Sequence, residues 1–314
     1  MARHPIRFGL QSGQQLVEWS ALRDLWQKAD AWGYDSLWAY DHFMPIFVNP
    51  EGPCFEGWTL LAALAQVTTR ARVGHLVNGN TYRNPCILAK QATTVDHLSQ
   101  GRLNLGIGAG WFELEHRQFG IDFKTVRGRL EALEEACQIL LGMFTGEKTT
   151  LAGKHYTVTD ALCLPRPVQQ PHPPLMIGGT GQKVLLRLVA QYADMWNASG
   201  SAEHIHHLID VIARHGDAVG RDPAAIEKTV MLPLCYRAPK ERQQFICQLV
   251  AAMRQTTPED ARRQIMIGEK AECLDTIERY VAAGATHFIF MIFTPYFLGE
   301  IQAFAEEVIP AVRV

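Results

Sequence analysis

Asp41 and His42 form a side-chain pair that could carry out acid–base chemistry. An imidazole gains or loses its proton near neutral pH, and a neighbouring carboxylate can fix its tautomer and its orientation. The pair follows the apolar segment Ser36–Tyr40 and opens a long loop rich in proline, glycine and aromatic residues. A histidine with an ordinary structural hydrogen bond is the alternative interpretation. We expect His42 and Asp41 to be catalytic, with Asp41 orienting His42 or contacting a bound ring.

A glycine-rich turn is the second candidate site. It follows the apolar run Leu175–Ile177, and a helical pattern begins near Lys183. Three glycines in four residues let the backbone approach a ligand, and the free N–H groups and positive dipole end of a helix favour a phosphate. A tight turn that needs its glycines only for backbone freedom is the alternative. The predicted phosphate-binding residues are Gly178, Gly179, Thr180, Gly181 and Gln182.

The elements that would position these residues alternate between strand and helix along the whole chain. Eight mostly apolar strands, each followed by a helix, predict an α/β fold of the closed (β/α)8 TIM-barrel type with insertions. A doubly wound sheet is the alternative, but no topological switch point can be located. A barrel brings the carboxyl ends of all strands to one rim. The expected strands are Ile6–Gln11, Ser36–Tyr40, Ala71–Val77, Arg102–Ile107, Leu175–Ile177, Met195–Ser199, Thr229–Tyr236 and Thr286–Phe293.

Residues 1–314 are expected to form a single domain with an insertion at about residues 145–173, between the fourth and fifth strands. This proline-rich segment contains a candidate hairpin over residues 149–158, and strand–helix alternation resumes directly after it. The length alone allows two average domains or one large α/β barrel, and the resumed alternation favours the single barrel.

The composition is that of a globular protein that does not bind nucleic acid or membranes. The chain has 30 basic and 32 acidic residues, and no basic run stands out. No apolar stretch is long enough to cross a membrane. The seven cysteines are scattered singly, without a C-x-x-C pair, so a disulfide framework or zinc site is not indicated and a reducing cytoplasm is expected.

Two motifs suggest chemistry that their context does not support. The segment Gly106–Trp111 resembles the dinucleotide fingerprint G-x-G-x-x-G, but Trp111 takes the place of the last glycine and no acidic residue follows at the required spacing. It instead marks a strand end where backbone can approach a flat ligand. His204 and His206 could suggest a metal site, but they open a predicted helix and fit a solvated helix face better. No metal site is expected.

Taken together, the chain resembles the luciferase-like monooxygenase family of flavin- and deazaflavin-dependent barrel enzymes, and most closely its coenzyme F420-dependent oxidoreductase branch. The resemblance covers nearly the whole sequence, and the ensemble of motifs is specific although no single motif is. The segments that carry it are Gly33–Trp38 with Asp41-His42, Thr68–Gly74, Tyr82–Pro85, Leu88–Lys90, Asp96–Arg102, Leu105–Trp111 with Glu115, Ile177–Gly179 and Ala193–Asn197.

This resemblance implies a luciferase-like (β/α)8 barrel, a homodimer, and a cofactor ring that lies across the carboxyl-terminal rim. It implies a phosphate held by the turn after the fifth strand and a non-proline cis peptide near Val77, Asn78 and Gly79, which would bracket the ring together with Gly110 and Trp111. The histidine that matches His42 commonly lies beside the reacting atom of the cofactor. The implied cofactor is coenzyme F420 and the implied substrate a small organic molecule.

Three functions stay open at this level, with metal-dependent hydrolysis as a distant fourth. The first is an F420-dependent oxidoreductase that transfers a hydride; the aromatic loop after His42 would cover an apolar substrate. The second is a two-component monooxygenase that uses reduced FMN supplied by a separate reductase. The third is a non-catalytic flavin-binding protein. Trp111 stands where some sugar-phosphate-oxidising relatives carry a glutamate, which argues against a sugar-phosphate dehydrogenase.

Overall fold

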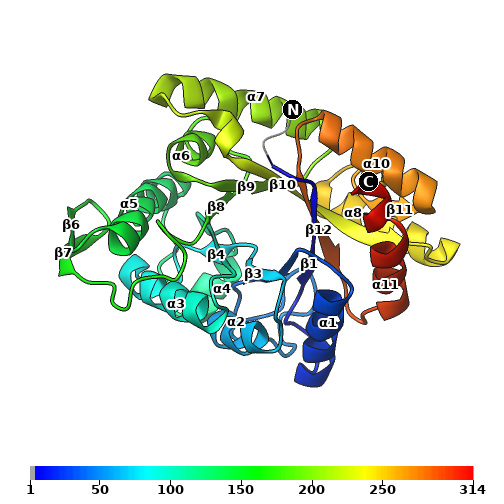
Figure 1. The fold of residues 1–314 in the computed structure, drawn as a ribbon, viewed down its shortest axis with the longest axis horizontal. Helices are drawn as coiled ribbons and strands as arrows, with labels where there is room; N and C mark the ends of the chain where they lie inside the picture. The colour runs from blue at the N-terminus through cyan, green and yellow to red at the C-terminus, as the bar shows by residue number, and fades with distance from the viewer. Residues whose placement is uncertain (1–3, 314) are drawn as a thin grey trace.

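The structure is a computed structural model that describes residues 4–313. A ring of eight parallel strands lies at its centre (Figure 1). Each strand pairs with the next, and β12 pairs with both β10 and β1, so the ring is closed. This confirms the predicted (β/α)8 barrel. The ring strands are β1 (Arg7–Ser12), β2 (Ser36–Ala39), β3 (Arg72–His75), β5 (Leu103–Gly108), β8 (Leu175–Gly178), β9 (Met195–Ala198), β10 (Glu227–Tyr236) and β12 (His287–Ile292).

Helices surround the ring and bury one face each against it (Figure 1). In the helix Ala202–Val219, for example, Ile205, Leu208 and Ile212 are buried at helical spacing. The longer helices are α1 (Trp19–Ala31), α2 (Gly57–Gln66), α3 (Pro85–Leu98), α5 (Val126–Thr145), α6 (Leu185–Tyr192), α7 (Ala202–Val219), α8 (Lys240–Arg254), α10 (Lys270–Ala282) and α11 (Leu298–Glu307). The short ones are α4 (Glu113–Gln118), α9 (Pro258–Arg262), α12 (Ile309–Val312) and the 3-10 turn Pro223–Ala225.

The strands are buried on both faces, which explains their continuous apolar sequence. On the outer face of β12, Phe288 and Phe290 pack against Phe8 of β1 and Phe304 of α11, and the ring centroids of this cluster lie 4.8 to 6.2 Å apart where they stack or meet edge-on. The alternate residue, Ile289, belongs to a smaller apolar cluster with Trp38, Met176 and Met195. Leu76 and Val77 pack against this second cluster.

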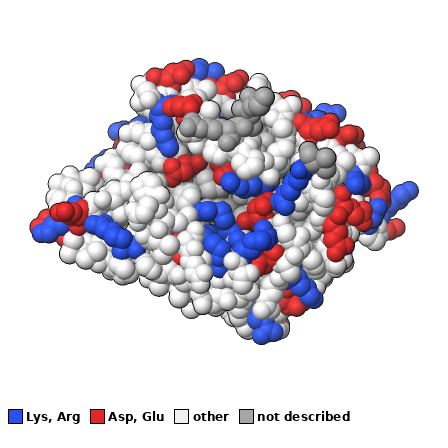
Figure 2. All heavy atoms as spheres, viewed as in Figure 1, with Lys and Arg blue, Asp and Glu red and all other residues white. Residues whose placement is uncertain are grey.

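The hairpin expected in the segment between the fourth and fifth ring strands is present. Strands β6 (Thr149–Ala152) and β7 (Thr157–Ala161) pair antiparallel and lie outside the barrel (Figure 1). Basic and acidic side chains lie side by side on the face of the molecule shown in Figure 2. No helix within residues 4–313 is long and apolar enough to cross a membrane.

The structure differs from the sequence-based expectation in short elements. The third strand was expected to run from Ala71 to Val77, but β3 ends at His75 and a separate two-residue strand, β4 (Asn78–Gly79), pairs with β5. Helix α6 begins at Leu185, after a turn that starts at Gln182. Helices α4 and α9 and strand β11 (Met266–Gly268) were missed. Elements of three to six residues are too short to show a hydrophobic period.

Candidate active site

A cavity of about 500 Å³ opens at the carboxyl-terminal rim of the barrel. It is lined by residues of β1, β4, β5, β8, β9, β10 and β12, by the loop that follows β2 and by the turns after β5 and β8. Ten of the twelve residues predicted from the sequence line it: Asp41, His42, Val77, Asn78, Gly79, Gly110, Trp111, Gly178, Gly179 and Thr180. The other two, Gly181 and Gln182, continue the turn just beyond the cavity wall.

His42 is held by a buried carboxylate that comes from another part of the chain. Its Nδ1 lies 2.8 Å from Oε2 of Glu115, and both side chains are more than nine-tenths buried. An ionised carboxylate only accepts hydrogen bonds, so Nδ1 carries the hydrogen. Nε2 of His42 has no hydrogen-bond partner among residues 4–313 and, in the neutral ring, is the acceptor available to a ligand in the cavity.

The buried carboxylate of Glu115 accepts hydrogen bonds from four donors. Besides His42, the hydroxyl of Tyr82 donates to Oε2, and the backbone N–H groups of Phe43 and Met44 donate to Oε1 at 2.6 and 3.2 Å. Burial alone would raise the pKa of Glu115, but the bonds from His42, Tyr82 and Phe43 outweigh it and lower the pKa. The same burial and the neighbouring carboxylate raise the pKa of Tyr82, which stays a neutral donor. Glu115 is therefore a charged acceptor that fixes His42.

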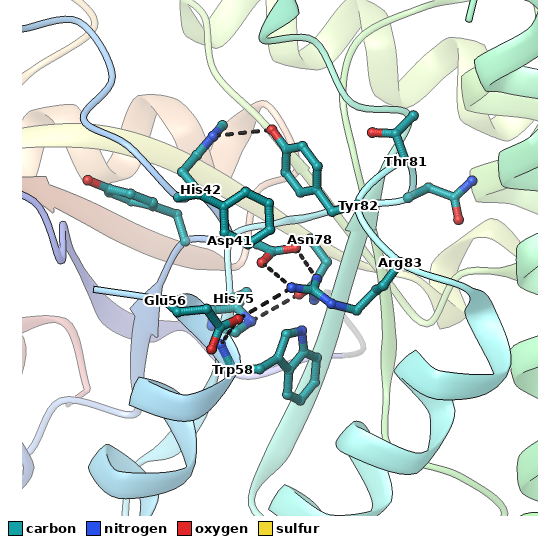
Figure 3. A network of polar contacts seen from close by, with 12 residues as sticks. Asp41, His42, Glu56, Trp58, His75, Asn78, Thr81, Tyr82 and Arg83 are labelled. Carbon is teal, nitrogen blue, oxygen red and sulfur yellow. Dashed lines mark hydrogen bonds and ion pairs between the residues drawn. The ribbon is translucent and has the colours of Figure 1, made fainter. Parts of the chain in front are cut away.

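Asp41 does not play the orienting role that we expected for it. Its fully buried carboxylate is bound by the guanidinium of Arg83, with Nη2 donating to Oδ1 at 3.0 Å and Nη1 donating to Oδ2 (Figure 3). Arg83 also lies 3.4 Å from the carboxylate of Glu56. The fork of the guanidinium matches both oxygens of Asp41, so its direction is set by Arg83 and not by His42. Asp41 still lines the cavity.

The segment between β3 and β4 forms the floor of the cavity. The peptide bond between Leu76 and Val77 is cis, directly before the segment where the resemblance placed such a bond. Val77 packs on glycines: a Cβ added at Gly108 or Gly178 would lie 3.0 Å from a methyl group of Val77. Oδ1 of Asn78 lies 3.0 Å from Nδ1 of His75 (Figure 3). The side-chain N–H of Asn78 donates to Gly106 O. Glycine at both strand ends is therefore needed to seat Val77 under the ligand space.

The glycine-rich turn offers three unpaired donors. Gly179 has φ +134°, its N–H donates to Asn197 O, and its carbonyl accepts from the indole of Trp196. After this anchor, the backbone N–H groups of Thr180, Gly181 and Gln182 find no acceptor within residues 4–313. They precede α6, whose amino end adds a positive dipole. The arrangement suits an anion such as a phosphate.

Aromatic side chains cover the open side of the cavity beside His42. The rings of Phe47 and Trp111 stack with centroids 5.5 Å apart, and both are about half exposed. The Trp111 ring meets the imidazole of His42 edge-on, with centroids 5.8 Å apart. Phe47 comes from the aromatic loop and Trp111 from the segment after β5, so the two predicted regions meet over the histidine. They can shield the reacting atoms from water.

The sequence did not indicate several residues of this site. Glu115 was noted only as part of a motif, and Arg83 likewise; neither had an assigned partner. Gln11, at the end of β1, also lines the cavity. The sequence could have indicated Gln11, because it is a polar residue at the end of an apolar barrel strand and is placed at the rim for the same reason as Asp41. Within the described part of the chain, no group of three or more His, Cys, Asp or Glu side chains is placed to hold a metal ion.

Comparison with known proteins agrees with the fold. The sequence model of the luciferase-like monooxygenase family matches residues 3–246. An F420-dependent glucose-6-phosphate dehydrogenase of Kineococcus radiotolerans is 26% identical, with 98% of each chain covered. A solved F420-dependent secondary alcohol dehydrogenase superposes with a TM-score of 0.85 at 21% identity, covering 99% of this chain and 100% of its own. The F420-dependent tetrahydromethanopterin reductase of Methanopyrus kandleri gives 0.83 at 17% identity, covering 98% and 100%. The chain thus belongs to the luciferase-like monooxygenase family.

Proposed function

We propose that the protein is an oxidoreductase that uses coenzyme F420 and transfers a hydride between the deazaflavin and a small organic substrate. The observation that carries the proposal is the His42–Glu115 pair, which presents a free imidazole nitrogen to the rim cavity. The relatives named as F420-dependent dehydrogenases support the choice of cofactor.

The residues at the rim fit a flat ring that carries a phosphate. Val77, Asn78 and Gly79 give the ring a floor, and Gly110 and Trp111 give it a side wall. The unpaired N–H groups of Thr180, Gly181 and Gln182 would bind the phosphate. Bound there, a deazaflavin supplies a ring carbon that accepts or donates a hydride. Asp41, neutralised by Arg83, would contact the ring from the β2 side.

The protein's own groups would handle the proton that accompanies the hydride. Nε2 of His42 takes the proton from a substrate hydroxyl in the oxidation direction and returns it in the reverse direction. Glu115 holds the imidazole in the tautomer that leaves Nε2 free, and it stabilises the charged imidazolium after proton uptake. Phe47 and Trp111 exclude water while the substrate is bound.

Titration of the purified protein with each cofactor tests the proposal. We expect F420 to bind, measured through its fluorescence, and to be reduced or oxidised in the presence of a substrate. Tight binding of FMN without a response to F420 would instead identify a two-component monooxygenase that takes reduced FMN from a separate reductase. Binding of either cofactor without turnover over a broad substrate panel would favour a flavin-binding protein.

We also infer the location, the oligomeric state and the domain organisation of the enzyme. All seven cysteines are free thiols, which supports a reducing cytoplasm as its location. Ile87 of α3 and Leu162 and Leu164 after β7 are at least half exposed, which supports a homodimer that covers them. Residues 1–314 would act as one domain, with residues 145–173 as an insertion. Light scattering in solution checks the dimer.

Replacement of Glu115 by glutamine should lower kcat by at least about tenfold, because an amide side chain at this position can donate as well as accept and no longer selects one tautomer of His42. The ¹⁵N chemical shifts of the His42 ring should change from a single Nδ1–H tautomer to a mixture. Glu115→Asp, which keeps an ionised acceptor, should recover part of the rate. An unchanged tautomer in E115Q would show that Glu115 does not position His42.

The substitution Glu115→Gln should also change how the stability of the protein depends on pH. The pKa of Glu115 is lowered in the folded protein, so the carboxylate stabilises the fold at pH values above its usual range. This contribution disappears as the pH falls through the lowered pKa. Urea unfolding of wild type and E115Q should therefore differ most near neutral pH, and the two curves should converge in acid.

Replacement of Gly179 by alanine should weaken binding of the phosphate-bearing cofactor and destabilise the turn by about 1–3 kcal/mol. The φ of +134° disfavours any side chain, and a Cβ would lie 2.9 Å from Leu185. Gly181→Ala is the matched control, because its Cβ would make only an ordinary 3.4 Å contact with Leu185. Fluorescence titration and urea unfolding measure the two effects. Equal behaviour of the two variants would contradict the role of Gly179.

A further inference from the structure

A second cavity of about 250 Å³ adjoins the main one. It lies between α8, the aromatic loop after β2 and the segment that follows β12. The two cavities adjoin at five residues that line both of them: Gln11, Tyr40, Ile46, Phe47 and Met291. We call this second cavity the side chamber.

The side chamber is apolar and carries no charged lining residue. Its lining includes Phe47 and Met291, together with Leu249 and Met253 of α8. The main cavity has one acidic residue, Asp41, which Arg83 already neutralises, and neither cavity is lined by lysine or arginine. A phosphate or carboxylate on the substrate would meet no lysine or arginine in the side chamber, and the anion-binding turn that includes Gly178–Thr180 lies in the main cavity, where it is assigned to the phosphate of the cofactor. The lining of the side chamber therefore favours an uncharged substrate.

One buried polar side chain at the boundary of the two cavities lacks a partner. Gln11 is 6% exposed and lines both cavities, and its amide makes no hydrogen bond to any residue from 4 to 313. The other glutamine of the chamber, Gln15, is different, because its amide is used by both the N–H and the carbonyl of Ile46. The amide atoms of Gln11 are accessible from the cavities and not sealed in the core, so they are available to hydrogen-bond to a ligand there.

We propose that the side chamber binds the apolar body of an uncharged substrate that carries a single hydroxyl or carbonyl group, and that Gln11 hydrogen-bonds this group. The inference rests on the proposed function, because it places the polar group in the cavity that His42 also lines. The substrate then differs in class from a phosphorylated sugar. Phe245, Leu249 and Met253 on α8 set how long an apolar chain can be.

Calorimetric binding of straight-chain secondary alcohols, from 2-butanol to 2-octanol, to the cofactor-loaded protein tests the proposal. Burial of each added methylene should tighten binding by about fourfold until the chamber is full. Glucose 6-phosphate should not compete. Affinity that does not depend on chain length, or competition by glucose 6-phosphate, would overturn the proposal.

Variants of α8 localise the effect. Leu249→Trp should fill the chamber and abolish the dependence on chain length, whereas Ala252→Trp, on an exposed position of the same helix, should retain it. Equal chain-length dependence in wild type and L249W would refute the chamber as the binding site. Gln11→Leu should weaken 2-hexanol binding by about fivefold, the worth of one hydrogen bond. Unchanged affinity in Q11L would remove Gln11 from the proposal.

Cofactor binding and the dependence of affinity on chain length are independent results. A protein that binds F420 but shows no chain-length dependence keeps the proposed function and loses the substrate class. A protein that binds only FMN, yet shows the dependence and its loss in L249W, keeps the side chamber and loses the F420-dependent function.

Discussion

Replacement of His42 by alanine should reduce kcat by about 10²- to 10⁴-fold, the usual contribution of one general acid–base group. The cofactor should still bind, because the floor at Val77–Gly79 and the turn at Gly178–Gln182 do not depend on the imidazole. The loss should therefore appear in the transfer step and not in cofactor affinity. Absorbance of the deazaflavin follows turnover, and its fluorescence follows binding.

A histidine outside the rim cavity provides the matched control for His42→Ala. His206→Ala removes an exposed histidine on α7, outside the rim cavity, and should leave both measurements unchanged. If H42A instead loses cofactor affinity and keeps its rate when saturated, His42 binds the ring and does not move the proton. Unchanged turnover and affinity together would place the chemistry on another residue.

The sequence predicted the barrel because its strands are buried on both faces and read as short apolar runs. The boundaries of long helices were also accessible: Pro85 opens α3 and Gly220, with φ +69°, ends α7. The break after His75 was not accessible from the local pattern, because the apolar residues Leu76 and Val77 follow it directly, as in a strand that continues.

In the site, the sequence predicted residues but not their partners. Asp41 and His42 end a strand, so a barrel places both on the rim whatever their contacts are. Their partners, Arg83 and Glu115, lie 42 and 73 positions away, and only the folded chain brings them together. Glu115 is carried by α4, six residues long, which has no visible hydrophobic period. The adjacency of Asp41 and His42 in the sequence thus suggested a contact between their side chains, but in the structure each side chain binds a different residue.

Replacement of Arg83 by methionine should destabilise the protein by about 3–5 kcal/mol, because it leaves Asp41 as a buried charge without a partner. The Asp41 carboxylate is fully buried and the Arg83 side chain is 12% exposed, so the carboxylate would lose its bidentate partner in a poorly hydrated place. Urea unfolding measures the change. Lys28→Met breaks an ion pair whose side chains are both nearly half exposed, and it should cost less than about 1 kcal/mol.

The double variant Asp41→Asn with Arg83→Met distinguishes a lost attraction from an unpaired charge. If the uncompensated carboxylate causes the destabilisation, removal of its charge should restore a large part of the stability lost in R83M. If the double variant is no more stable than R83M, packing of the Arg83 side chain is the cause, and Asp41 is held by the fold without its partner. The first outcome would mean that Arg83 allows an acidic residue to line the cavity beside His42, since it is the ion pair that makes the buried Asp41 carboxylate tolerable there.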